Sequence, residues 1–155
     1  ISGDDAYKEK SYRSFNWVTY ASDKDGKALE HPLSIKGIIS WWSDTYGECT
    51  RMFYHGFAAM PEWAPQKENH ILYSEDILKH VVYSDKKIQY VPSVNNGTEY
   101  LRLAFKPVAI TVGGVKIPLN PATGNSGYFL RDVGNGDYAL TIKRSRKGDV
   151  IITGL

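Results

Sequence analysis

The sequence is poor in the residues that carry most enzyme chemistry. Its 155 residues include one cysteine, two methionines and four histidines. A single cysteine excludes an internal disulfide, and we interpret Cys49 as a small buried hydrophobe. No apolar run approaches the ~20 residues that span a bilayer, so we expect no transmembrane segment. The formal net charge of +2 is too small to indicate nucleic acid or an acidic membrane as the partner.

The motifs of common catalytic sites are missing as well. There is no Gly-x-Ser-x-Gly turn and no phosphate-binding glycine loop. His55, Glu62 and His70 match no metal-ligand spacing, so we expect neither a metal nor a cofactor. Glycosidases need two carboxylates about 5–10 Å apart, and Asp44, Glu48 and Glu62 could supply such a pair. A small glycoside-cleaving enzyme therefore stays an alternative to a protein with no catalytic residues.

Aromatic residues, by contrast, are abundant. The chain has 11 tyrosines and 4 tryptophans, and 13% of its residues are aromatic. The densest cluster lies in residues 37–57, which we predict to form two strands joined by a turn at residues 43–47. Because side chains alternate along a strand, Trp41 and Trp42 should point to opposite faces of the sheet. One of them then belongs to the core, and the other is covered by another element or exposed.

An exposed cluster of rings would suit a carbohydrate ligand. Sugar rings stack their C–H faces on aromatic side chains while their hydroxyls bond polar tips. Trp63 belongs to the same hypothesis, because it lies in a long irregular loop, residues 58–69, of the kind that often has a function. The predicted ligand-binding residues are Trp42, Tyr46, Arg51, Tyr54 and Trp63. The alternative interpretation is that the Trp41–Trp42 pair and Trp63 pack into the core.

Two further segments have local signals. Residues 14–20 alternate in the manner of a strand, with Phe15 and Trp17 on one face. Residues 74–80 instead predict a short helix, because Ser74 can cap its start and Lys79 and His80 suit its negative end.

From residue 81 onwards the pattern is that of a β meander. Turn signals occur at residues 95–97, 113–114, 134–136 and 145–148, with short strands between them. Along residues 98–105, Tyr100 and Arg102 alternate with Leu101 and Leu103, so the two pairs should lie on opposite faces of a strand. We therefore predict an all-β fold, an antiparallel β-sandwich of the jelly-roll or immunoglobulin-like type, with about ten strands and one short helix near residues 75–80. We expect residues 1–155 to form one domain.

A basic run at residues 143–147 raises the question of nucleic acid. The run falls at a predicted hairpin tip, where lysine and arginine also keep sheet edges soluble. With the net charge near zero, we expect no nucleic-acid partner.

The C-terminal half resembles a known group of domains. Residues 100–115, the stretch 134–143 and the closing strand at residues 150–154 resemble the terminal β-sandwich domains of secreted glycan-processing proteins from gut bacteria. The resemblance covers residues 81–155 and transfers no catalytic residue. It implies an accessory domain of a larger bacterial protein for polysaccharide utilisation. It also implies an extracytoplasmic location, with which the first residue, Ile1 in place of a methionine, agrees.

These observations converge on a binding protein. We predict a non-catalytic carbohydrate-binding or accessory β-sandwich whose partner is a polysaccharide or oligosaccharide. The alternative is a structural module whose aromatic cluster packs against a catalytic domain of the same parent chain.

Overall fold

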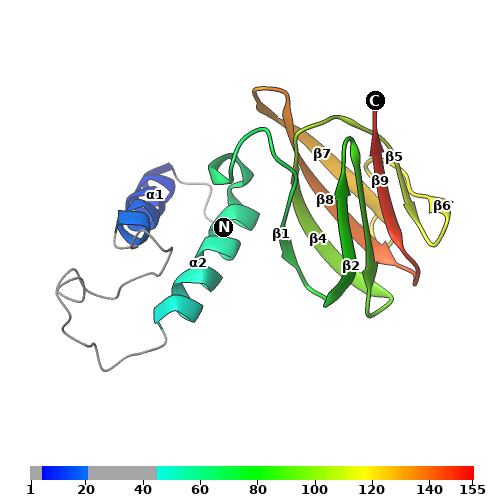
Figure 1. Ribbon diagram of the computed structural model, residues 1–155, viewed down its shortest axis with the longest axis horizontal. Coiled ribbons are helices and arrows are strands. Elements are labelled where there is room, and N and C mark those ends of the chain that lie inside the picture. Colours follow the sequence, from blue (N-terminus) through cyan, green and yellow to red (C-terminus); the bar gives the residue numbers. More distant parts are fainter. Residues whose placement is uncertain (1–4, 21–44) are drawn as a thin grey trace. The chain divides into compact units, whose positions relative to one another are not determined.

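The structure is a computed structural model that describes residues 5–20 and 45–155 (Figure 1). The chain divides into two compact units, Ile1–Gly56 and Phe57–Leu155. The first unit contains helix α1, Asp5–Tyr20, and most of helix α2, Thr45–Ala59. The second unit contains the short 3-10 helix η2, Pro61–Trp63, and all nine strands of the described residues.

The strand predicted at residues 14–20 is wrong, because these residues form the second half of α1. The first half is rich in good helix formers such as Ala6 and Lys8, and Arg13 pairs with Glu9 one turn earlier at 2.8 Å. Once a helix has nucleated, each further residue is added at little cost. The preference of Phe15 for a strand was therefore outweighed by the sequence before it.

The strand predicted at residues 49–57 is also wrong, because α2 covers this segment. Phe53, Gly56 and Phe57 are half-buried, whereas Tyr54 and His55 are exposed. A buried face at positions i, i+3 and i+4 has the period of a helix. The strand predicted at residues 37–42 lies outside the described residues.

The second unit confirms the prediction of a sandwich-like, all-β fold. Its two antiparallel sheets have the strand orders β1-β4-β8-β7 and β2-β3-β9-β5-β6, and Figure 1 shows them stacked. The strands are β1 His70–Ser74, β2 Leu78–Ser84, β3 Lys87–Pro92, β4 Asn96–Leu103, β5 Pro107–Val112, β6 Val115–Lys116, β7 Gly127–Gly134, β8 Asp137–Ser145 and β9 Val150–Gly154.

The core lies between the two sheets. It is built from aliphatic and aromatic residues at alternate strand positions, as expected where one face of each strand is buried. Its buried members are Ile88, Tyr90, Leu101, Leu103, Phe105, Ile110, Val112, Ile117, Leu140, Ile142, Val150 and Ile152.

Two of the predicted hairpin turns are confirmed. Gly113 and Gly114 join β5 to β6 with φ of +56° and +75°. Residues 134–136 join β7 to β8, and Asn135 has φ of +57° between two glycines that also have positive φ. Positive φ at successive positions is what a tight hairpin turn requires, and glycine and asparagine accept it most readily.

The hairpin predicted at residues 95–97 is wrong. These residues carry the chain from β3 in one sheet to β4 in the other, and Gly97 already pairs with Arg144 inside β4. A Cβ on Gly97 would lie 2.7 Å from Nη2 of Arg144. Glycine is therefore needed here to leave room for a side chain.

The helix predicted near residues 75–80 is wrong as well, since Leu78 begins β2. The polar groups that indicated a helix cap build a turn between β1 and β2 instead. Ser74 Oγ accepts from the amide of Asp76 at 3.1 Å, and Asp76 Oδ1 accepts from the amide of Ile77 at 2.6 Å. A helix of six residues has little stability of its own, so pairing of β2 with β3 prevails.

Candidate functional site

Three aromatic side chains form a row across the four-stranded sheet. Tyr73 of β1 lies opposite Tyr100 of β4, Tyr100 lies opposite Thr141 of β8, and Thr141 lies opposite Phe129 of β7. Directly opposite residues of antiparallel strands share a face of the sheet. The next residue on β4, Leu101, belongs to the core, so this row is on the outer face. We call Tyr73, Tyr100, Thr141 and Phe129 the aromatic row.

The rings of the aromatic row are accessible to different degrees. Tyr73 and Tyr100 are half-buried, and their centroids are 6.1 Å apart with the planes tilted by 55°. Phe129 is 40% exposed, and Nζ of Lys143 lies 5.6 Å from its centroid. With a spacing of about 4.8 Å between strands, the row spans about 14 Å of the sheet.

Residues 61–67, which we call the covering segment, lie along one side of the aromatic row. Arg102 on β4 and Arg131 on β7 share the outer face with the row and are each two residues from one of its rings. Arg102 Nη1 donates to the carbonyl of Pro61 at 2.9 Å and to that of Glu62 at 3.2 Å. Arg131 forms an ion pair with the carboxylate of Glu62.

Arg102 is the anchor of the covering segment. Its side chain is 1% exposed although it points away from the core, because the covering segment lies over it. Its Nε and Nη2 donate to Asp137 Oδ2 at 3.0 and 2.7 Å, and the amide of Lys67 donates to the same oxygen at 2.9 Å. Because Arg102 also binds the carbonyl of Ala64, it holds the backbone on both sides of Trp63.

A proline lies over the other side of the aromatic row. Gly127 is two residues from Phe129 on the outer face of β7, and a Cβ there would lie 2.4 Å from Cγ of Pro121. The amide of Asn120 donates to the carbonyl of Tyr128 at 2.8 Å and so ties this loop to the edge of β7. The aromatic row is therefore the part of the outer face between the covering segment and Pro121.

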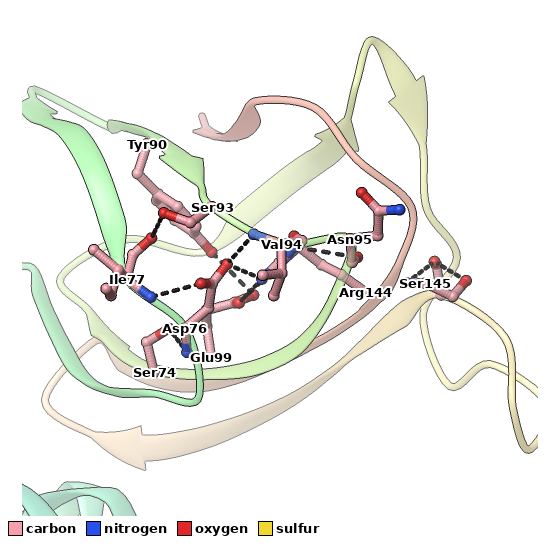
Figure 2. Close-up of polar contacts among 11 residues, drawn as sticks. Ser74, Asp76, Ile77, Tyr90, Ser93, Val94, Asn95, Glu99, Arg144 and Ser145 are labelled. Carbon is pink, nitrogen blue, oxygen red and sulfur yellow. Dashed lines mark hydrogen bonds and ion pairs between the residues drawn. The ribbon is translucent and has the colours of Figure 1, made fainter.

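The inner side of the same sheet carries a second polar cluster, drawn in Figure 2. Arg144 Nη2 lies 2.7 Å from Glu99 Oε1 and 3.4 Å from Asp76 Oδ2. Its Nη1 donates to the carbonyl of Val94 at 2.8 Å, and the Tyr90 hydroxyl lies 3.5 Å from Glu99 Oε2. We call Asp76, Tyr90, Glu99 and Arg144 the Glu99–Arg144 cluster.

Burial decides what the Glu99–Arg144 cluster can do. Burial raises the pKa of Glu99, against the opposing effect of the Arg144 guanidinium, and it raises the pKa of Tyr90 well above its ordinary value. The amide of Val94 lowers the pKa of Asp76. The side chains of Glu99 and Arg144 have no exposed surface. Since Tyr90 belongs to the five-stranded sheet, the cluster links the two sheets and is not open to a ligand.

The five ligand-binding residues predicted from the sequence are not all described. Trp42 lies outside the described residues. Tyr46, Arg51 and Tyr54 lie in α2, and Trp63 lies in η2. Arg51 and Tyr54 are exposed and, three residues apart, share one side of the helix. The structure thus places the four described residues on helical segments, where the sequence predicted a turn for Tyr46, a strand for Arg51 and Tyr54, and a loop for Trp63.

The acids and histidines considered for chemistry are also placed. Asp44 lies outside the described residues, Glu48 and His55 lie in α2, and Glu62 pairs with Arg131. Within residues 5–20 and 45–155, no three His, Cys, Asp or Glu side chains are grouped so that they could hold a metal ion. No helix in these ranges has the length and apolar character needed to cross a membrane.

Sequence reasoning missed Tyr73, Tyr100 and Phe129 as a set. Alternation along residues 98–105 did place Tyr100 opposite Leu101, and the glycine turn at residues 134–136 predicted the hairpin that brings Phe129 beside β8. The missing information was the pairing of β1 with β4 and of β4 with β8, which no local signal gives.

Comparison of the chain with protein-family models, with curated proteins and with solved structures found no match.

Proposed function

We propose that this protein is a non-catalytic carbohydrate-binding or accessory β-sandwich of an exported bacterial glycan-processing protein. In this proposal the aromatic row binds a polysaccharide or oligosaccharide. The observation that carries the proposal is the row itself, three rings and a threonine on one outer sheet face. For the finer fold we favour the jelly-roll type, which lectin domains use, because the chain changes sheet after β1, β3, β4, β6 and β8.

The chemistry of the aromatic row suits a sugar chain. Aromatic faces offer apolar area to the C–H faces of sugar rings, and tyrosine adds a hydroxyl that can bond the sugar's own. Thr141 stands between Tyr100 and Phe129, and Thr98 lies on the same face of β4. A strip about 14 Å long fits an extended chain of several sugars better than a small compact ligand.

The test is a binding assay with the ring residues removed one at a time. We would measure the retention of the whole chain by a panel of immobilised polysaccharides, then titrate soluble fragments of those that bind. Tyr100→Ala and Phe129→Ala should each weaken binding by about 5- to 30-fold, the loss of about 1–2 kcal/mol of stacking and burial. Tyr54→Ala is the matched control, because Tyr54 is an exposed aromatic residue of the helical unit.

The outcomes separate three interpretations. Loss of binding in Tyr100→Ala and Phe129→Ala, with Tyr54→Ala unchanged, supports the aromatic row. Loss in Tyr54→Ala alone moves the site to the cluster predicted from the sequence. Unchanged binding in all three folded variants removes both sites from the proposal.

A second candidate function is docking against a catalytic domain of the same parent chain. It is favoured by β2, an edge strand on which Val81 and Val82 are 38% and 53% exposed. Exposed apolar residues on an edge strand often mark a contact with another chain or domain. Val82→Lys should then weaken association with that domain and leave glycan binding unchanged, as measured by co-purification and by the titration above.

A further inference from the structure

We infer that the glycan bound by the aromatic row is acidic, and that Lys143 binds its carboxylate or sulfate group. This inference rests on the proposed function and goes on to name the class of ligand. Phe129 is the most exposed ring of the aromatic row, and a cation lies beside it.

Lys143 places a cation over the exposed ring. It is exposed on the outer face of β8, opposite Thr98 on one side and Gly127 on the other. Its Nζ lies 5.6 Å from the centroid of Phe129. Among the described residues it forms no ion pair with a carboxylate, and its ammonium lies against the ring of Phe129.

Two carboxylates of this face are already paired with arginines. Asp137 pairs with Arg102, and Glu62 pairs with Arg131. Glu68 precedes β1, whose first residue, His70, lies opposite Arg102, four positions along β4 from Thr98, the partner of Lys143. These three carboxylates are therefore paired or distant and do not offset the charge of Lys143.

Glu75, whose amide donates to the carbonyl of Thr98, is an exposed acid just after β1. It lies two strands from Lys143, about 10 Å at ordinary strand spacing, which is about one screening length in physiological salt. Arg146 and Lys147 continue the exposed basic run at the end of β8. The β7–β8 end of the aromatic row is therefore positively charged.

A ligand that stacks on Phe129 must either displace the Lys143 ammonium from that ring or interact with it. A neutral sugar would displace Lys143 and lose the cation–π contact without any replacement. An acidic sugar would exchange that contact for an ion pair at the rim of the stacked ring. The hydroxyls of Thr98 and Thr141, on the same face, are placed to add hydrogen bonds to the sugar or its acidic group.

The experiment uses matched acidic and neutral ligands with the whole chain. One pair is a uronate oligosaccharide and its carboxyl-reduced counterpart, and the other is a sulfated oligosaccharide and its desulfated counterpart. The wild type should bind at least one acidic member about tenfold or more tightly than its neutral counterpart, with an affinity that falls as salt rises. The two pairs distinguish carboxylate from sulfate as the recognised group.

Lys143→Met retains most of the side-chain length and removes the charge, and should bring the two members of the pair to within about twofold of each other. Lys143→Arg should keep the preference. Lys116→Met, which removes an exposed lysine of the other sheet, is the control and should change nothing. Equal binding of acidic and neutral members by the wild type, or an unchanged preference in Lys143→Met, overturns the inference but leaves the proposed function standing. If neither pair binds and no neutral glycan does, the proposed function fails with it.

Discussion

Replacing Arg102 by methionine should destabilise the sandwich far more than the same change at Arg131. Both arginines point outward from the four-stranded sheet, and both pair with a carboxylate beside the covering segment. They differ in burial. The side chains of Arg102 and Asp137 are 1% and 2% exposed, whereas those of Arg131 and Glu62 are 56% and 33% exposed.

The magnitude follows from what each change leaves behind. Arg102→Met leaves the Asp137 carboxylate buried without its arginine, although the amide of Lys67 still donates to it. The change also removes the donor that binds three backbone carbonyls. Breaking a buried ion pair in this way costs about 3–5 kcal/mol, a large part of the ~5–15 kcal/mol that stabilises a typical domain. Arg131→Met removes an exposed pair and should cost about 0–1 kcal/mol.

The assay is urea unfolding of the whole chain near neutral pH, followed by far-UV circular dichroism, with the free energy of unfolding taken from the linear fit. Asp137→Asn in the Arg102→Met background is the third variant. It removes the orphaned charge, so the double variant should be more stable than Arg102→Met alone.

A cost below about 1 kcal/mol for Arg102→Met would refute this reasoning, because a buried, unpaired carboxylate is more expensive than that. An equal cost at Arg102 and Arg131 would refute it too. In both cases the covering segment would not be held over Arg102 in solution.

Two further predictions concern the Glu99–Arg144 cluster. Hydrogen bonding lowers the pKa of Asp76 in the folded protein, so the ionised carboxylate stabilises the fold above its ordinary pKa of 3.8, and this stabilisation is lost as the pH falls through the lower folded-state pKa. Asp76→Asn should therefore destabilise the protein near pH 6 and much less near pH 2, as measured by urea titrations at the two pH values. Gly97→Ala should cost about 1–3 kcal/mol, because the new Cβ meets a guanidinium that cannot move away from Glu99, and the cost should shrink in an Arg144→Met background.

Predictability from the sequence differed sharply between the two units. Residues 81–155 gave strands and turns that the structure largely confirms, because glycine-rich turns and alternation act over a few residues. The strand predicted in the N-terminal half was wrong. Phe15 and Trp17 are residue types that favour strands, but they follow a run of helix formers and continue that helix. A choice between helix and strand in such a segment depends on partners far away in the sequence.

The same division applies to the candidate site. Alternation correctly put Tyr100 on the face opposite Leu101, and the turn at residues 134–136 correctly predicted a hairpin. The aromatic row could not be predicted, because it exists only when the strands pair in the order β1-β4-β8-β7. The five residues predicted from the sequence were selected because aromatic residues are dense in that part of the chain. A helix spreads such a cluster around its axis. A sheet instead aligns residues from strands that are distant in the sequence.

The two buried arginines show why exposure on the outer face could not be inferred from alternation alone. Arg144 points inward, so its burial agrees with its strand position, and two carboxylates compensate its charge. Arg102 points outward and should be exposed by the same rule, but a segment about forty residues earlier lies over it. That segment covers Arg102, whereas Phe129 in the adjacent cross-strand row is 40% exposed.

In the proposed function, the position of the covering segment sets one boundary of the binding site on the sheet. Arg102 is covered by backbone carbonyls, whereas Phe129 in the adjacent cross-strand row keeps an exposed ring. Arg102 is not part of the aromatic row, but it holds the covering segment beside the row in place. Loss of Arg102 should for this reason impair glycan binding even under conditions where the sandwich stays folded, whereas loss of Phe129 should impair binding with little effect on stability.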